Sequence, residues 1–327
     1  MTEQHAGAET EALEPELPIC DPHHHLWDER EPAYRLDAFV ADTRTGHNIV
    51  SSVYVEVQSH HRADGPRHLA PVGETAWVAS LPAPGGLLGG IVAFADLRRG
   101  SAVEEVLAAH AEAGGARFRG IRHVVAWDPD PHFWRGYARD GGTLSLPQFE
   151  EGLVAVGRAG LTFETWCYFP QVPQLTALVE RQPDVPVLLD HLGGPAGEGS
   201  YAGLRAEVLE TLQGSLRDLA RHPSVHLKLG GIGMTVYGMG YENRAAPVTS
   251  AEMATDWGDF IRWCIDLFGP DRCMFESNYP VDGASCSYLV LWNAFKRIAA
   301  GCSREEKQAL FFGTACRAYR LDAPAPS

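Results

Sequence analysis

Short runs of apolar residues alternate along this chain with longer segments in which apolar residues recur every three or four positions. The short runs predict β-strands, and the longer periodic segments predict amphipathic helices. The predicted strands are 18–21, 48–57, 90–96, 120–125, 161–166, 185–190, 225–229 and 272–276. The predicted helices are 102–113, 146–159, 171–181, 204–221, 253–268, 285–300 and 303–320.

This alternation is typical of parallel α/β architecture, and a count of eight strands favours a closed barrel over an open sheet. We therefore predict a single-domain (β/α)₈ barrel, the TIM-barrel class, over residues 18–322. The acidic, polar residues 1–17 predict a disordered or extended leader, and residues 323–327 a short tail. Ser250 and Ser303 each precede acidic residues, so we expect both to cap helices.

The composition narrows the classes of function. The 327 residues include 42 acidic and 27 basic side chains, a formal net charge of −15 that repels nucleic-acid phosphates and anionic lipids. No run approaches the length of a membrane span, and no secretory signal or disulfide framework is visible. We expect a cytoplasmic protein that acts on a small-molecule substrate, without nucleic acid or membrane as a partner; a homodimer is compatible with the sequence.

The segment Asp21-Pro-His23-His24-His25 carries the sharpest chemical signal. Side chains alternate between two faces of an extended chain, so His23 and His25 point one way and His24 points the other. Two imidazoles side by side at the end of the first strand form a ready pair of metal ligands. The alternatives are a polar surface loop or a purification tag, although a tag would be longer and terminal.

Two further segments place polar residues at the ends of later strands. A buried apolar strand ends at Asp190-His191, and the last strand runs into Glu276, Asn278 and Asp282. In a parallel barrel the carboxyl ends of the strands form the active-site face, so His191 is expected beside the first-strand histidines. The alternatives are a capping histidine at 191 and a turn in which Asn278 only satisfies backbone groups.

Taken in order, these segments resemble the amidohydrolase superfamily, and specifically its amidohydrolase-2 branch. That branch includes sugar-acid lactonases, pyrone-dicarboxylate lactonase and several decarboxylases. The resemblance covers residues 18–322. The segments that carry it are D-P-H-H-H-L-W-D at 21–28, G-I-R-H at 120–123, F-E-T-W at 163–166, L-D-H-L-G-G-P at 189–195, L-K-L-G-G at 227–231, F-E-S-N-Y-P at 275–280 and F-G-T-A-C-R-A-Y-R-L at 312–321.

The resemblance implies a divalent metal, one or two ions of Zn²⁺ or of Fe²⁺ or Mn²⁺. His23 and His25 would be first-strand ligands and His191 a later-strand ligand. Glu164 ends a middle strand, where an acidic residue could bridge two ions. Asn278 would be a further, weaker ligand at the last strand.

The resemblance also implies roles for basic side chains. Arg122 and Lys228 would face the substrate, and the metal together with Arg122 or His123 would stabilise an oxyanion. Each residue has a structural alternative: Arg122 could pair with Glu164, and Lys228 could belong to an ion pair inside the barrel.

One position departs from the family pattern. The family usually carries aspartate at the end of the last strand, as the proton acceptor, where this chain has Asn278. An amide cannot act as a carboxylate base and is a weaker, neutral ligand. The metal alone could activate water, Glu164 or Asp282 could serve as the base, or hydrolysis could be lost altogether.

The loops that follow the predicted strands are rich in aromatic residues and methionine. They indicate an apolar pocket for a bulky acyl or aromatic substrate. We expect substrate contacts from Trp27, Tyr168, Met234 and Tyr237. The glycine-rich loop 230–240 suits either a mobile lid or a rigid turn.

These observations predict a metal-dependent hydrolase of a lactone, ester or thioester. A metal-bound hydroxide would attack the carbonyl, and Asn278 would orient the water. One rival is a metal-dependent lyase, such as an aromatic-acid decarboxylase, which needs no water-activating aspartate. The other is a non-catalytic barrel that binds a small molecule.

Overall fold

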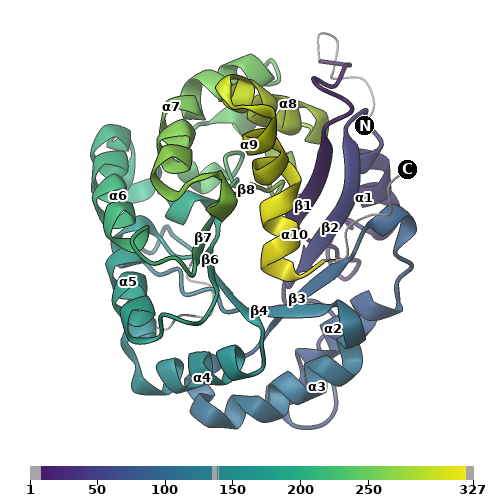
Figure 1. The fold of residues 1–327 in the computed structure, drawn as a ribbon, viewed down its shortest axis with the longest axis vertical. Coiled ribbons are helices and arrows are strands. Elements are labelled where there is room, and N and C mark those ends of the chain that lie inside the picture. The colour runs from purple at the N-terminus through teal and green to yellow at the C-terminus, as the bar shows by residue number, and fades with distance from the viewer. Residues whose placement is uncertain (1–8, 135–137, 139, 322–327) are drawn as a thin grey trace.

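The computed structural model describes residues 9–134, 138 and 140–321, and these residues form one barrel of eight parallel strands (Figure 1). Each strand pairs with the next along the chain, which confirms the predicted (β/α)₈ TIM-barrel class. The strands are β1 (Pro18–His24), β2 (Asn48–Val55), β3 (Gly90–Phe94), β4 (Phe118–Arg122), β5 (Thr162–Thr165), β6 (Val187–Leu189), β7 (Val225–Leu229) and β8 (Cys273–Phe275).

The barrel closes just beyond the end of β8. The backbone N–H of Asn278 donates to the carbonyl of His23 at 2.9 Å, and that of His25 donates to Tyr279 at 2.8 Å. His24 and Tyr279 form a parallel bridge between the same two segments. The closure therefore joins the histidine segment of β1 directly to the segment that carries Asn278.

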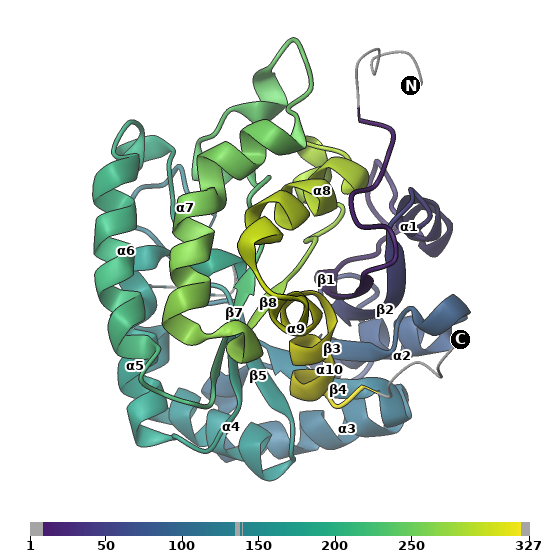
Figure 2. The same ribbon diagram turned by 45° about the horizontal axis from the view of Figure 1, so that its top comes forward.

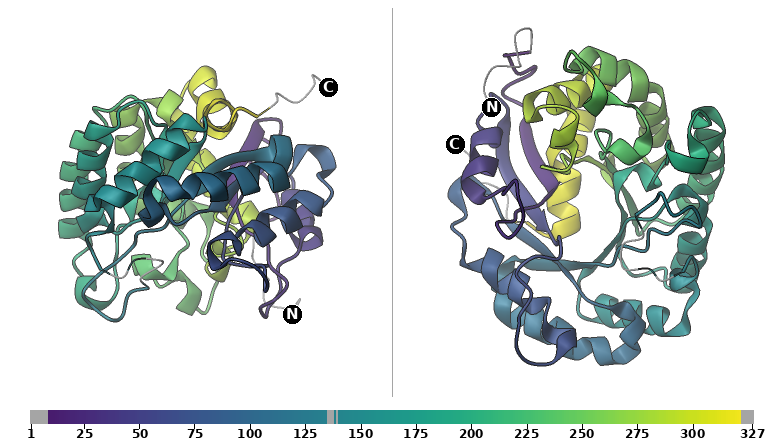
Figure 3. Two further views of the ribbon diagram at one scale, coloured as in Figure 1. Left: turned by 90° about the horizontal axis from the view of Figure 1, so that it is seen from below. Right: turned by 180° about the vertical axis from the view of Figure 1, so that it is seen from behind.

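Helices surround the strands and cover their outer faces (Figures 1 and 3). The seven predicted helical regions are present, although the predicted helix 303–320 is divided into α9, a π-helical turn at Ala309–Gly313 and α10. The helices are α1 (Leu36–Thr43), α2 (Val72–Ser80), α3 (Glu104–Gly114), α4 (Pro147–Arg158), α5 (Val172–Arg181), α6 (Arg205–Leu219), α7 (Ser250–Phe268), α8 (Tyr288–Ile298), α9 (Arg304–Gln308) and α10 (Thr314–Tyr319).

The sequence analysis missed α1 and α2. Both are short, and neither begins with a side-chain cap. The expected cap at Ser303 is confirmed by a capping box with Glu306. The expected cap at Ser250 is wrong by one residue, because Thr249 caps α7 and pairs with Glu252.

Helix α10 covers the ends at which the strands begin, opposite the active-site face (Figure 2). The hydroxyl of Thr314 donates to the carbonyl of Pro270, just before β8, and Arg320 donates to the carbonyl of Arg119 in β4. Tyr319 is fully buried among apolar side chains that point into the barrel, and its hydroxyl donates to Glu164 at 2.8 Å. The barrel floor is therefore packed and hydrogen-bonded by this helix.

The described part of the predicted leader, residues 9–17, lies against α7 and α8. Glu9 accepts hydrogen bonds from the Ser250 hydroxyl at 2.7 Å and from the Asn293 amide at 2.8 Å. Buried Lys296 donates to the carbonyls of Leu13 and Glu14 at 2.7 and 2.9 Å. These hydrogen bonds fix residues 9–17 to the barrel. Within the described ranges, no helix is long and apolar enough to cross a membrane.

A buried carboxyl group on α2 should make stability depend on pH. Glu74 accepts hydrogen bonds from the Tyr54 hydroxyl and the Val57 N–H, both at 2.7 Å. Burial, with the nearby charge of Glu56, raises the pKa of Glu74 from 4.5 to about 7. The folded protein then holds a proton that the unfolded chain releases, so this group's contribution to stability is lost as the pH rises from about 4.5 to about 7.

Glu74→Gln keeps the accepting oxygen and removes the titration. We expect the urea midpoint of E74Q, compared with that of the unsubstituted protein, to improve steadily between pH 5 and pH 7.5. The control is Glu112→Gln at an exposed position of α3. Parallel stability curves for E74Q and the unsubstituted protein across this range would contradict the prediction.

Candidate active site at the carboxyl ends of the strands

A cavity of about 540 Å³ opens at the carboxyl ends of the strands. Its polar residues fall into two groups, at the base and at the rim. Those at the base are His25, Arg122, His191 and Asn278, and those at the rim are His132, Glu198 and Thr235. The walls are mostly apolar and aromatic, formed by Val57, Val124, Trp134, Trp166, Tyr168, Met234, Val236, Val281 and Ala284.

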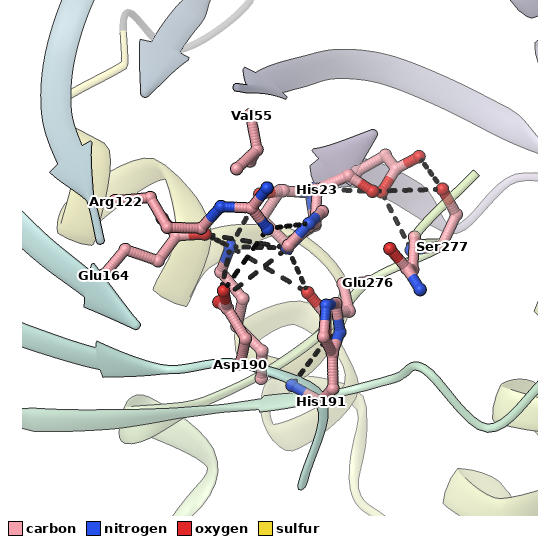
Figure 4. A network of polar contacts seen from close by, with 12 residues as sticks. His23, Val55, Arg122, Glu164, Asp190, His191, Glu276 and Ser277 are labelled. Carbon is pink, nitrogen blue, oxygen red and sulfur yellow. Dashed lines mark hydrogen bonds and ion pairs between the residues drawn. The ribbon is translucent and has the colours of Figure 1, made fainter. Parts of the chain in front are cut away.

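Three histidines converge at this base. The Nε2 atoms of His23 and His25 are 3.2 Å apart, and the ring centroids of His23 and His191 are 4.5 Å apart. Figure 4 shows His23 and His191 on either side of Glu276. His24 points to the opposite side, where its ring stacks on Phe39 at 3.8 Å. The alternation expected along β1 is therefore confirmed, and the later-strand histidine lies where the barrel topology predicted.

Each of the three imidazoles is anchored by an oxygen at Nδ1. The Val55 carbonyl lies 2.8 Å from Nδ1 of His25. Glu276 contacts the other two, with Oε2 2.8 Å from Nδ1 of His23 and Oε1 2.7 Å from Nδ1 of His191. A proton on each Nδ1 satisfies these oxygens and leaves a lone pair on every Nε2.

The pKa shifts of His23, His25 and Glu276 are consistent with these contacts between imidazole rings and oxygens. Burial is the main cause that lowers the pKa of His23 and of His25 well below the ordinary histidine value, and the charges of Lys228 and Arg122 add to it. Burial raises the pKa of Glu276, but the interactions of this carboxylate with His191 and with the charge of Lys228 have the larger effect. Together they hold the pKa of Glu276 below its usual value. The cluster therefore combines neutral imidazoles at His23 and His25 with an ionised carboxylate at Glu276.

Glu276 is a functional residue that the sequence analysis placed at the active-site mouth without giving it a role. Two glycines after β7 let it approach His191. A Cβ on Gly230 would overlap the Glu276 side chain, and a Cβ on Gly231 would lie 2.7 Å from the His191 Cβ. The signal was available in the sequence, because an acidic residue directly follows the apolar strand β8 and a Gly-Gly pair follows its neighbour β7.

Lys228 lies beneath the histidines and is fully buried, so it does not line the cavity. It forms an ion pair with Glu164, and its Nζ is 3.3 Å from Asp190 Oδ1. The expected contact between Lys228 and substrate is therefore not supported, and the alternative of an ion pair inside the barrel is the one observed. Removing one partner of such a buried pair typically costs about 3–5 kcal/mol, because the other charge is then left buried and uncompensated.

Arg122 does line the cavity, as expected for a residue that faces substrate. Its Nε donates to Glu56 Oε1 at 2.8 Å, and its Nη1 is 3.2 Å from His23 Nε2. A guanidinium group thus lies beside the histidines, where it can donate to an oxygen of a bound substrate.

Asn278 and Asp282 form a fixed pair at the end of β8. Asn278 has left-handed backbone geometry, with φ 51°, and its side-chain amide donates to Asp282 Oδ1 at 2.8 Å. The other oxygen of Asp282 accepts from the Gly233 N–H at 2.8 Å. Burial raises the pKa of Asp282 to about 8. Asp282 is therefore placed behind Asn278, where it orients the amide, and does not line the cavity as a base would.

His123 is displaced from the site. Side chains alternate along β4, so Arg122 points into the barrel and His123 points out. The His123 ring packs between Phe94 and Phe149, and its Nδ1 accepts from the Leu97 N–H at 3.2 Å. The expectation that His123 stabilises an oxyanion is contradicted by this position.

Of the four aromatic and methionine residues expected to contact substrate, two line the cavity and two do not. Tyr168 and Met234 line the cavity. Tyr237 is buried behind it and donates to the His191 carbonyl at 2.6 Å, so it positions that histidine. Trp27 lies outside the cavity lining and packs against Tyr34.

The glycine-rich loop 230–240 is held in place at several points. Besides the bonds of Gly233 and Tyr237 described above, the Ser285 hydroxyl donates to the Gly233 carbonyl at 2.7 Å. These contacts support the rigid turn among the two expectations for this loop.

The cluster fits a divalent cation. The Nε2 lone pairs of His23 and His25 face each other at 3.2 Å, an arrangement that favours a shared cation between them. Ligand atoms of His23, His191 and Glu276 lie within 4.8 Å of one another, as do those of His23, Glu164 and Asp190.

The buried charged residues around the histidines also favour a cation at this site. Neither carboxylate oxygen of Asp190 accepts a hydrogen bond within the described residues. The buried acids near the histidines outnumber the buried bases: they are Glu56, Glu164, Asp190 and Glu276 against Arg122 and Lys228. Burial and the charge of Glu164 raise the pKa of Asp190 well above its usual value, and a bound cation would favour the ionised form of this carboxyl group.

Comparisons with known proteins agree with this geometry. The chain is 30% identical to the uncharacterised protein y4mH of Sinorhizobium fredii, over 94% of this chain and 99% of the relative. It is 29% identical to an L-fucono-1,5-lactonase of Burkholderia multivorans, over 77% of this chain and 78% of that enzyme. A crystal structure of an amidohydrolase from Burkholderia multivorans with bound zinc superposes with a TM-score of 0.72, at 25% identity, over 93% of this chain and 99% of that chain.

A family model described as "Amidohydrolase" matches residues 20–321, a range that contains all the strands except the first two residues of β1. The matched range includes the three converging histidines, Glu276 and the closing helix α10. With most of the barrel and its whole polar base inside the match, this chain belongs to the amidohydrolase family of the amidohydrolase-2 type.

Proposed function

We propose that this protein is a metal-dependent hydrolase that opens a lactone or cleaves a comparable ester or thioester. The observation that carries the proposal is the grouping of three histidine rings at the base of a cavity. The Nε2 atoms of His23 and His25 are 3.2 Å apart, and the ring centroids of His23 and His191 are 4.5 Å apart. Glu276 and the Val55 carbonyl contact the Nδ1 atoms of these rings. The names of the L-fucono-1,5-lactonase relatives support the lactone class.

The residues that would hold the cation are His23, His25 and His191. Three protein ligands leave a coordination position open, as in catalytic zinc sites. When bound there, a divalent ion supplies Lewis-acid polarisation of a carbonyl and lowers the pKa of water. Glu276 would act through two of the histidines, because a carboxylate on Nδ1 fixes the ring orientation and raises the basicity of Nε2.

The remaining groups at the base act on the substrate and on water. Hydrolysis forms a bond between the water oxygen and the acyl carbon, breaks the acyl–oxygen or acyl–sulfur bond, and leaves a proton on the departing atom. Arg122 is placed to donate to the carbonyl oxygen as negative charge develops on it. Asn278, held by Asp282, orients water without deprotonating it.

The cavity walls favour a bulky, largely apolar acyl or aromatic substrate. Trp134, Trp166 and Tyr168 form one aromatic side, with the two indole rings stacked at 5.7 Å. Met234 and Val236 lie among the other lining residues. A polyhydroxylated sugar acid would find few hydrogen-bond partners on these walls.

One observation also favours a lyase as a second candidate. Of the residues that the structure describes, no carboxylate lines the base of the cavity; Glu198 lines its rim, 3.1 Å from His132. Decarboxylation of an aromatic acid needs no carboxylate to take a proton from water. Release of carbon dioxide from such an acid, without hydrolysis of acyl compounds, would identify this function.

The metal assignment predicts stoichiometric binding that depends on Glu276. Protein purified without added metal and then loaded with zinc or manganese should bind about one ion per chain. Glu276→Gln should weaken metal affinity about 10–100-fold, because it removes the acceptor that orients two ligands. The control is Glu74→Gln, which alters a buried acid that contacts none of the three histidines. Unchanged metal binding in both E276Q and His191→Ala would rule out this site.

The hydrolase assignment is tested with lactones, esters and thioesters that carry aromatic or branched acyl groups. We expect turnover that a chelator abolishes and a divalent metal restores. Arg122→Met should lower kcat/KM about 10²–10³-fold, the typical loss for one oxyanion donor. Arg181→Met, at an exposed position of α5, is the control. If the metal-loaded protein leaves the whole panel intact, the protein is not the proposed hydrolase.

A further inference from the structure

A second chamber, of about 440 Å³, lies beside the cavity. The two share Val57, Arg122, Val124 and Trp134 as lining residues, so they are neighbours with Arg122 at the partition. Arg30, Glu56 and Gln58 line only the second chamber. None of the three histidines lines it, and the chemistry assigned above takes place on the other side of Arg122.

We propose that this side chamber is a subsite for a carboxylate group on the substrate, and that Arg30 and Gln58 bind it. The inference rests on the proposed function, because it assigns a place to a part of the acyl substrate that does not react. Arg30 is thus a specificity-determining residue, outside the metal site.

The guanidinium group of Arg30 has two contacts with the protein and further N–H donors that can bind a ligand. Its Nη2 donates to the Val57 carbonyl, and its guanidinium carbon lies 5.1 Å from the centroid of the Trp27 ring. The planar guanidinium group carries five N–H donors, so one hydrogen bond and one stacking contact leave most of them for a ligand. Trp27 lies outside the cavity, and its ring supports the guanidinium group of Arg30.

The acidic residues around Arg30 are engaged elsewhere. Asp28 is 2.8 Å from His60, Glu29 accepts from the His60 N–H at 3.0 Å, and Glu31 accepts from the Ala33 N–H at 3.3 Å. In the described ranges, no carboxylate pairs with Arg30. A cation at the wall of a chamber, with its neighbouring acids turned away, is arranged for an external anion.

Gln58 supplies the second donor. The backbone of Gln58 is left-handed, with φ 60°, a conformation that residues other than glycine seldom adopt. Strain of this kind persists where the surrounding structure imposes it, and it is common at binding sites. Within the described part of the chain, the Gln58 amide has no hydrogen-bond partner, which leaves it available to a carboxylate oxygen.

The charges in the chamber support an anion in particular. Among the described residues that line the chamber, Arg30 and Arg122 are positive and Glu56 is negative; the Glu56 carboxylate is paired with Arg122 at 2.8 Å. The chamber is therefore positive in a chain whose formal net charge is −15. Such a local field concentrates an anionic ligand that the rest of the surface repels.

The test measures binding of a matched pair of ligands that contain no hydrolysable acyl bond. The probes are 5-oxo-5-phenylpentanoate, which has an aromatic ketone and a distal carboxylate, and its neutral primary amide. Calorimetry on the metal-loaded full chain should show tighter binding of the carboxylate. Arg30→Gln should weaken carboxylate binding about 10-fold or more and change amide binding less than about twofold.

Two variants complete the design. Arg30→Lys should restore part of the affinity, because it keeps the charge and loses the planar fork. Arg35→Gln alters an exposed arginine of the same loop that lines neither chamber, and it should leave both ligands unaffected. Thermal unfolding of each variant checks that the fold is intact.

The outcomes separate this inference from the proposed function. Equal affinity for the two ligands, an equal loss of both in R30Q, or no binding of the carboxylate would overturn the subsite. Binding does not require turnover, so these results leave the hydrolase assay untouched. Failure of that assay, with carboxylate-selective binding retained, would overturn the hydrolase and leave the anion subsite standing.

Discussion

Glu276 is the contact on which the rest of the site depends. Its two oxygens reach Nδ1 of His23, in β1, and Nδ1 of His191, which follows β6. Without this carboxylate, His23 and His191 would lose the acceptor at Nδ1 that fixes the tautomer and the orientation of each ring. A fully buried carboxylate is costly unless it is paired, and here two imidazoles and the nearby charge of Lys228 pair it.

Several features of the fold serve that contact. The barrel closes through the segments that carry His23 and Asn278, so the first and last strands hold the histidine and the glutamate at a fixed separation. Gly230 and Gly231 provide the space in which Glu276 meets His191. The Tyr237 hydroxyl donates to the carbonyl of His191, whose backbone has a left-handed φ of 53°. These supports are contributed by β1, β7, β8 and their loops.

The sequence could reveal the fold and the grouping of the histidines because both depend on local patterns. Alternation along β1 separates His23 and His25 from His24, and strand order brings His191 to the same face. What the sequence could not reveal depends on contacts between distant segments. The partners of Lys228 and Glu164 inside the barrel, and the position of Asp282 behind Asn278, follow from packing across the barrel.

His123 is the clearest case in which the sequence led to a wrong prediction. It is adjacent to Arg122 in the sequence, and the resemblance to the family made either residue a candidate for the oxyanion. The alternation rule that separated the histidines of β1 applies equally to β4 and would have excluded His123. Helices α1 and α2 were missed for a different reason, since both are short and obtain their stability from contacts with the barrel.

The floor contributed by α10 has a consequence for synthesis on the ribosome. His23 emerges early, whereas Glu276, which orients its ring, and Tyr319, which hydrogen-bonds Glu164 from below, emerge some 250 to 300 residues later. Lys228 can pair with Glu164 before then, but His23 lacks the carboxylate that contacts its Nδ1, and Glu164 lacks its hydrogen bond from Tyr319. The polar base of the cavity is therefore complete only when the last strand and α10 have joined the barrel.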